Sequence, residues 1–364
     1  TNFDCALGPR QLVLGPNGAG KSSLFEVLSL LRDFCIRGDA PDLLPPSPRF
    51  GGASRTKWQQ VHEQIFELDV RGPEGLYLFR LAVDTYGSSE RPRVLKEEVI
   101  LNGKPIFRFE KGEVHLYNDK SEDKVQYPFD WHRSALATIA ERRDNMKLSW
   151  FKRWFAGVLC IQPDPWSMRG IAAEEAERPD RHLSNFADWY RHMRQETTDQ
   201  EYIADLRKVI AHFDTMRLEG AGEGRREIKV RMDTRTDGKA AKREEEYLLS
   251  ELSEGQRVLI GLYAVLHFAL KPGATICFDE PDNFIALAEV QPWLTGVLDR
   301  TEDDDASQVL IASHHPEILN RMAFKEGLLL DRPGGRQTRV RRLDDPSGTG
   351  LSAAELIARG WDHE

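Results

Sequence analysis

Hydrophobic and polar residues follow different periods in different parts of the chain. In the first third, apolar residues occupy every second position of several short runs, which is the period of a half-buried strand. Turn residues separate these runs, for example Gly72 to Gly75 and Asn102 to Lys104. The pattern predicts an antiparallel β meander over residues 60–127.

Elsewhere the chain carries helical periods and short, wholly apolar runs. Helical spacing predicts helices over 133–156, 183–216 (with a break near Thr197), 258–270 and 351–360. Wholly apolar runs predict buried strands at 12–14, 158–161, 275–278 and 309–312. Residues 228–232 predict one more strand, with a loose hairpin tip at Asp237 and Gly238. Strands that alternate with helices indicate an α/β protein.

Residues 15–22, G-P-N-G-A-G-K-S, lie between a predicted strand and a predicted helix. This context favours a P-loop, whose backbone N–H groups surround phosphates, over a glycine-rich turn with a surface lysine. Lys21 would reach the β- and γ-phosphates, and Ser22 would bind Mg²⁺. The expected nucleotide contacts are Asn17, Gly18, Gly20, Lys21, Ser22 and Ser23.

The apolar strand at 275–278 ends in two adjacent acids, Asp279 and Glu280. Without a P-loop, they would indicate an acidic turn after a buried strand. Together with the P-loop they predict a Walker B motif, in which Asp279 holds Mg²⁺ and Glu280 acts as the general base.

Three further segments resemble motifs of ABC-type ATPases. Residues 252–256, L-S-E-G-Q, resemble the L-S-G-G-Q signature, with Glu254 in place of the first glycine. The resemblance implies that Ser253, Gly255 and Gln256 contact the ATP of a second protomer, although Ser253 could equally be only a helix N-cap.

The other two segments follow predicted strands. His314 and His315 both compete for the role of the switch histidine, and alignment with the T-H-S-P pattern of family members assigns it to His314. Gln162 resembles the Q-loop glutamine that senses Mg²⁺ and the γ-phosphate; otherwise it is an ordinary turn residue before Pro163.

Together these motifs resemble the SMC/RecF-type branch of the ABC ATPases, and most of all the compact AAA_21/AAA_15 ATPases related to the OLD family, without a Toprim nuclease domain. Residues 2–3 (N-F), 279–283 (D-E-P-D-N) and 314–320 (H-H-P-E-I-L-N) resemble family segments as well. The resemblance implies an ABC-ATPase head with a β meander and a helical insertion. It also implies ATP and Mg²⁺ as ligands, and a head-to-tail homodimer in the ATP state.

The resemblance suggests three segments: an N-terminal ATPase lobe over 1–132, a helical insertion lobe over 133–246, and a C-terminal ATPase lobe over 247–364. The C-terminal lobe would hold the signature, Walker B and switch motifs.

The composition of the chain indicates which cellular compartment and which ligands are expected. The four cysteines are scattered and form no C-x-x-C pair, which disfavours zinc and disulfides and favours a reducing cytoplasm. No run approaches the roughly 18 apolar residues of a membrane span. The net charge of −9 disfavours general attraction to nucleic acid.

Three basic clusters nevertheless keep DNA or RNA open as a partner. The first cluster is interleaved with aromatic residues and consists of Arg133, Arg142, Arg143, Lys147, Lys152 and Arg153. The second cluster consists of Arg225, Arg226, Lys229, Arg231 and Arg235. The third cluster consists of Arg336, Arg339, Arg341 and Arg342.

The sequence leaves two functions open. The first is an ATPase of DNA repair or anti-phage defence that drives a partner effector or nuclease. The second is an ATP-sensing scaffold that sequesters an effector protein without acting on DNA. An ABC subunit of a membrane transporter fits less well, because the meander and helical insertion lie between the P-loop and the signature.

Overall fold

The computed structural model describes residues 3–37, 61–85, 93–234, 243–302, 307–332, 334, 337–343 and 350–360. Asn2, Arg235, the predicted tip at Asp237 and Gly238, and Arg336 lie outside these residues. The chain forms two compact units: Ser23–Val158, and Asn2–Ser22 together with Leu159–Glu364. The three-segment division expected from the sequence has other boundaries and stays a prediction.

The first unit contains a six-stranded antiparallel sheet whose strands are neighbours in chain order, which confirms the predicted meander. Its strands are β2 (Glu63–Gly72), β3 (Gly75–Asp84), β4 (Arg93–Leu101), β5 (Lys104–Glu110), β6 (Glu113–Tyr117) and β7 (Asp123–Pro128). Apolar side chains on one face, such as Phe79 and Phe107, are fully buried. Alternation along the strands therefore separates a core face from a polar face.

The helices of this unit pack aromatic residues onto the sheet. They are the greater part of α1 (Lys21–Arg32), the π-helical turn η1 (Asp33–Arg37), α2 (Ala135–Thr138) and α3 (Met146–Gly157). The predicted helix over 133–156 is thus confirmed only in part, because a loop separates α2 from α3. Phe151 of α3 is fully buried and stacks 5.8 Å from Phe79, so it contributes to the core and offers no surface for stacking bases.

The second unit is built around a six-stranded sheet in the order β16-β15-β1-β14-β13-β8. Five strands are parallel and β16 is antiparallel. The strands are β1 (Arg10–Leu14), β8 (Leu159–Ile161), β13 (Thr275–Asp279), β14 (Gln308–Ala312), β15 (Gly327–Asp331) and β16 (Arg339–Arg342). Together with the helices of this unit the sheet confirms the predicted α/β class, and the parallel strands bring the residues that follow β1, β8, β13 and β14 to one edge.

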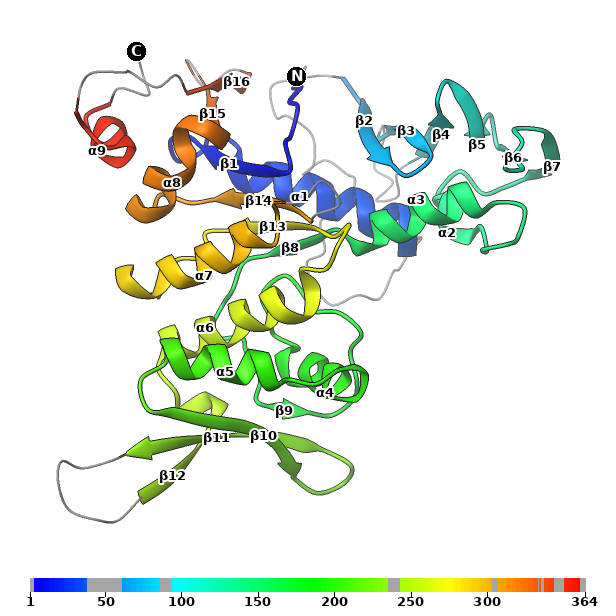
Figure 1. Ribbon diagram of the computed structural model, residues 1–364. Helices are drawn as coiled ribbons and strands as arrows, with labels where there is room; N and C mark the ends of the chain where they lie inside the picture. The colour runs from blue at the N-terminus through cyan, green and yellow to red at the C-terminus, as the bar shows by residue number, and fades with distance from the viewer. Residues whose placement is uncertain are drawn as a thin grey trace. The chain divides into compact units, whose positions relative to one another are not determined.

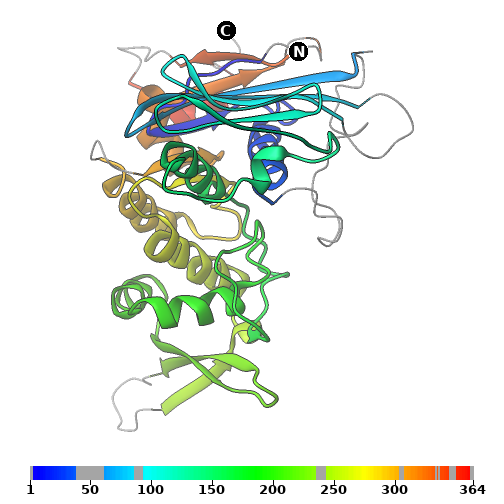
Figure 2. The ribbon, with the colours of Figure 1, turned by 90° about the vertical axis from the view of Figure 1, so that its right-hand side faces the viewer.

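An insertion between β8 and β13 forms a smaller mixed layer. Its elements are β9 (Ile171–Ala172), α4 (Phe186–Glu196), α5 (Gln200–Val209), β10 (Phe213–Gly220), β11 (Arg226–Thr234) and β12 (Arg243–Leu248). In Figures 1 and 2, α4 and α5 lie between the β10–β12 ribbon and α6 (Glu254–Ala264). The helix predicted over 183–216 is wrong after residue 209, because Phe213 to Met216 pair with β11 instead.

The remaining helical elements of the second unit follow the β12 strand. They are η3 (Leu249–Glu251), η4 (Val265–Ala269), α7 (Leu287–Asp299), α8 (Pro316–Glu326) and α9 (Ala353–Ala358). Helix α8 packs against β1 and β15, and α7 packs against α8. Within the described ranges, no helix is both long and apolar enough to cross a membrane.

Candidate nucleotide-binding site

The glycine-rich loop connects β1 to α1 in the conformation that its glycines allow. Gly15, Gly18 and Gly20 have φ angles of 139°, 80° and 107°, a region that residues with a Cβ rarely enter. A Cβ on Gly15 would also lie only 2.1 Å from the carbonyl oxygen of Leu330. The loop is therefore packed against β15, while Asn17 and Gly18 remain exposed.

Lys21 begins α1 and turns back toward the loop. Its Nζ donates to the Gly15 carbonyl oxygen at 2.7 Å, and the residue is only 6% exposed. Burial lowers the pKa of Lys21, while the charges of Glu280 and Asp279 act to raise it. The two acids thus favour the charged form of the lysine, which is the form that attracts phosphate.

Asp279 ends β13 and is 2% exposed. The Ser22 hydroxyl donates to its Oδ1 at 3.1 Å, and the Arg181 guanidinium donates to its Oδ2 at 3.1 Å. Burial raises the pKa of Asp279, and the hydrogen bond from Ser22 and the charge of Arg181 partly oppose this rise. The structure thus brings the predicted P-loop and Walker B residues into direct contact.

Glu280 follows with an unusual backbone. Its φ is 48°, and its N–H donates to the Ala312 carbonyl oxygen of β14 at 2.8 Å. Its carboxylate accepts a hydrogen bond from Asn283 Nδ2 at 2.9 Å. A left-handed conformation at a residue with a side chain costs free energy, so the surrounding structure must hold it in place.

The two histidines after β14 have different surroundings. His315 is buried and N-caps α8: its Nδ1 accepts from Glu317 N–H at 3.2 Å, and its own N–H donates to Ser313 Oγ at 2.9 Å. His314 is exposed. His315 thus caps a helix, and the contact of His314 with a nucleotide stays a prediction.

Gln162 directly follows β8, beside the strand that carries Asp279. Ile161 pairs with Phe278, so Gln162 continues the ladder next to Asp279. The Gln162 N–H donates to the carbonyl oxygen of Arg181 at 2.7 Å. The residue predicted from the Q-loop resemblance therefore positions the backbone of the arginine that binds Asp279.

The signature-like segment begins α6. Ser253 and Gln256 form a capping box, in which Ser253 Oγ accepts from Gln256 N–H at 3.3 Å and Gln256 Oε1 accepts from Ser253 N–H at 3.0 Å. A Cβ on Gly255 would lie 2.7 Å from the Phe284 carbonyl oxygen. Within the described part of the chain, no hydrogen bond joins Ser253, Gly255 or Gln256 to the phosphate loop.

Three residues around the loop were not predicted from the sequence. Arg181 binds Asp279 from 98 positions away, Thr338 Oγ1 donates to Ala19 O at 2.9 Å, and Arg332 Nη1 lies 3.5 Å from Gly18 O. None of these residues stands in a recognisable motif, and only the fold brings them together. Ser23, a predicted nucleotide contact, lies in the first turn of α1 and is exposed, and its contact with a nucleotide stays a prediction.

The residues present suit Mg²⁺ bound together with a nucleotide. The hydroxyl of Ser22 and the carboxylate of Asp279 are oxygen ligands 3.1 Å apart, and Mg²⁺ commonly takes one or two protein oxygens plus phosphate oxygens and water. No group of three His, Cys, Asp or Glu that could hold a metal by itself occurs among the residues described. The site therefore fits a metal that arrives with phosphate.

The glycine loop on β1, the lysine on α1 and the acid that ends β13 define a P-loop nucleotide-binding protein. The family model described as "AAA domain, putative AbiEii toxin, Type IV TA system" (AAA_21) matches residues 12–320. The chain belongs to this family, as the sequence motifs predicted.

The chain was also compared with solved structures and with curated proteins. The solved SMC head domain from Thermotoga maritima is similar to this chain, with 13% sequence identity, a TM-score of 0.43, and coverage of 94% of this chain and 93% of that one. A comparison with curated proteins gives no significant match.

Proposed function

We propose that this protein is an ATPase that binds Mg²⁺ and ATP at the loop of residues 15–22. The observation that carries the proposal is the meeting of Ser22 and Asp279, at 3.1 Å, beside the buried Lys21. A lysine charge, a hydroxyl and a buried carboxylate at the N-terminus of a helix suit a triphosphate and its metal. Bound Mg²⁺ would neutralise charge on the phosphate oxygens.

Each residue then has a distinct task in hydrolysis. Lys21 would exchange its hydrogen bond to the Gly15 carbonyl oxygen for phosphate oxygens, and Ser22 and Asp279 would hold the metal. Glu280 orients the attacking water and accepts its proton, and His314 contacts the γ-phosphate. Arg181 affects metal binding because its guanidinium binds the carboxylate of Asp279. Gln162 acts through Arg181, because its N–H binds the Arg181 carbonyl oxygen.

We further propose that two copies bind head to tail, with ATP between them. Ser253 ends the loop before α6, so the positive end of the helix is available to an anion outside its own chain. ATP would favour the closed dimer because both copies contact the phosphates only there. Closure and release would control a partner effector in DNA repair or anti-phage defence.

The hydrolysis proposal is tested by phosphate release from the full chain with two variants. Glu280→Gln should retain ATP binding but lose roughly 100-fold or more in turnover, the usual contribution of a positioned base. Lys21→Ala should lose ATP binding, measured with a fluorescent ATP analogue. Turnover by Glu280→Gln at the wild-type rate would contradict the assigned base.

A further inference from the structure

A separate pocket lies in the insertion of the second unit, on elements that do not form the phosphate loop. Its cavity has a volume of about 300 Å³, and it is lined by Arg191, Arg194, Gln195, Arg217, Leu218 and Arg226. Four of the six lining residues are arginines and none is acidic. We call it the arginine pocket.

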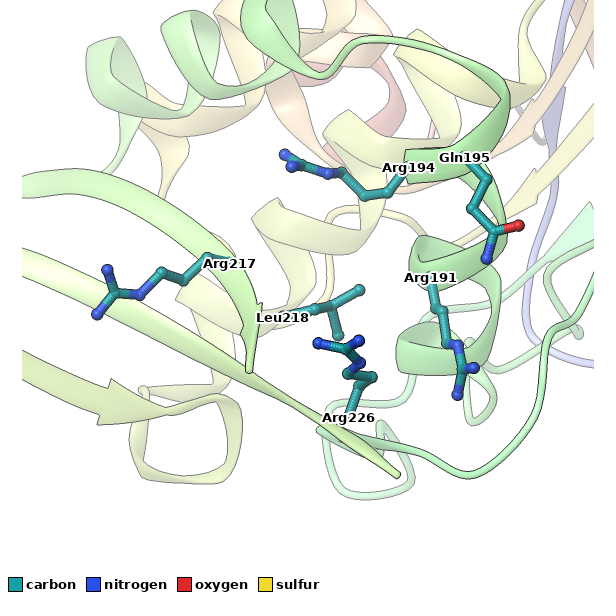
Figure 3. A pocket seen from close by; sticks show the side chains of 6 residues that line it. All are labelled: Arg191, Arg194, Gln195, Arg217, Leu218 and Arg226. Carbon is teal, nitrogen blue, oxygen red and sulfur yellow. The ribbon is translucent and has the colours of Figure 1, made fainter. Parts of the chain in front are cut away.

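The backbone explains how these side chains reach one place. Arg191, Arg194 and Gln195 are spaced i, i+3 and i+4 on α4, so they share one helical face. Leu218 pairs with Ile228 and Gly220 pairs with Arg226, so Leu218 and Arg226 share one face of the β10–β11 ribbon. Figure 3 shows the Arg226 guanidinium beside Leu218, with Arg191 extending from α4.

Three of the arginines already have acidic partners outside the lining. Arg191 lies 3.2 Å from Glu175, Arg194 pairs with Asp199, and Arg217 lies 2.7 Å from Glu219 and also pairs with Glu246. Figure 3 shows Arg217 pointing away from the other guanidinium groups. These pairs hold the three side chains in place, and Arg191 Nη1 also donates to the Gly224 carbonyl oxygen at 3.0 Å.

Arg226 is the exception. Its guanidinium forms no hydrogen bond or ion pair with any residue that the structure describes, although its backbone pairs with Gly220 on one side and Ala172 on the other. Its backbone is thus fixed in a sheet while its five N–H donors stay available. A guanidinium on rigid backbone loses little freedom when it binds an anion.

We propose that the arginine pocket binds a phosphate-bearing ligand, with Arg226 as the main contact and Arg191 and Arg194 as supporting donors. Guanidinium groups bind phosphate through paired N–H donors, and the volume is at the lower end for small-molecule sites. The pocket can therefore take a small phosphorylated molecule or one segment of a nucleic-acid backbone. Either ligand would bind independently of ATP at the phosphate loop.

The test uses Lys21→Ala protein, so that the phosphate loop does not bind the probes. Inorganic tripolyphosphate is titrated by calorimetry, and a labelled single-stranded oligonucleotide by fluorescence anisotropy at several salt concentrations. Arg226→Glu is compared with Arg225→Glu, a matched control because both side chains are exposed and Arg225 does not line the pocket. Arg226→Gln replaces the charge reversal if Arg226→Glu fails to fold.

We expect at least one probe to bind, and Arg226→Glu to weaken it about tenfold or more, against less than about twofold for Arg225→Glu. Tripolyphosphate binding alone identifies a small phosphorylated ligand. Tighter oligonucleotide binding that falls with salt identifies a nucleic-acid backbone. The proposal is overturned if neither probe binds, or if the two substitutions have equal effects. Because the Lys21→Ala background is used, neither result depends on ATP hydrolysis.

Discussion

Each of the two units buries a carboxyl group, and the two groups have different partners. In the first unit, Glu97 accepts hydrogen bonds from Ser134 Oγ at 2.6 Å, Ala135 N–H at 2.9 Å and Leu136 N–H at 3.2 Å. In the second unit, Asp279 accepts from the side chains of Ser22 and Arg181. Burial raises the pKa of both acids, and that of Glu97 reaches about 7.

The two acids differ in whether their hydrogen-bond donors can move away from the carboxylate. Two of the donors to Glu97 are backbone groups at the start of α2, so the acid holds one local structure together. Both donors to Asp279 are side chains that can rotate away and make room for a metal and its phosphates. For these two acids, backbone donors fit a structural role at Glu97, and replaceable side-chain donors fit a ligand site at Asp279, which lies beside the phosphate loop.

The largest expected effect is the loss of hydrolysis in Asp279→Asn. An amide cannot supply the carboxylate charge to Mg²⁺, so turnover should fall about 100- to 1,000-fold. Glu97→Gln is the matched control and should keep turnover within about twofold. The turnover of both variants is measured by phosphate release. Equal losses of turnover in the two variants would contradict the assignment of a ligand role to Asp279 and a structural role to Glu97.

The second effect concerns stability. Glu97→Ala leaves the Ser134 hydroxyl and two backbone N–H groups without their acceptor, which should lower the free energy of unfolding by about 2–4 kcal/mol. Glu113→Ala, at an exposed side chain, should cost less than about 0.5 kcal/mol. Urea unfolding followed by circular dichroism compares them. A stability loss as small as that of Glu113→Ala would mean that Glu97 does not hold α2.

The third effect is a pH dependence of stability. The pKa of Glu97 is 4.5 as a free group and about 7 in the fold, so the folded chain keeps a proton that the unfolded chain releases. The contribution of this group to the free energy of unfolding is therefore highest below pH 4.5 and falls as the pH rises to about 7, by on the order of 3 kcal/mol.

Glu97→Gln removes this titration and should flatten the stability profile over that range of pH. Urea unfolding of both proteins at pH 5, 6 and 7 tests it. A profile that has the same slope in the variant and the wild type would assign the pH dependence to other groups.

The smallest expected effect involves Arg181. Because Arg181 binds the same carboxylate as the metal would, Arg181→Gln should lower the Mg²⁺ concentration needed for half-maximal nucleotide binding by roughly threefold to tenfold. Arg178→Gln, at a nearby exposed residue, serves as the control. Titration of Mg²⁺ against a fluorescent ATP analogue measures the shift, and an increase in the required Mg²⁺ would show that Arg181 supports the metal instead of competing with it.

The sequence predicted those parts of the site that lie in contiguous motifs. Lys21, Ser22, Asp279 and Glu280 stand beside apolar strands whose type and order are visible in the chain. Arg181 has no motif because its position next to Asp279 depends on the ladder between β8 and β13. Arg226 likewise stands in no motif that places it in the arginine pocket, because its position there depends on the pairing of β10 with β11.

The fold was predicted least well where the apolar pattern is ambiguous. Ile210, Phe213 and Met216 are spaced as on a helix, but pairing with β11 makes residues 213–220 a strand. β12, R-E-E-E-Y-L, was not predicted because its polar side chains hide the alternation of a strand. In both places tertiary pairing decides the structure that local spacing leaves open.

If one chain holds only half of each ATP site, as proposed, ATP must join two copies, and the mass of the complex in solution shows whether it does. Glu280→Gln protein is measured by size-exclusion chromatography with light scattering, with saturating ATP and Mg²⁺, beside the Glu280→Gln/Lys21→Ala double variant. We expect a dimer for the single variant, because ATP stays bound without hydrolysis, and a monomer for the double variant. A monomeric single variant that has ATP bound would contradict this proposal.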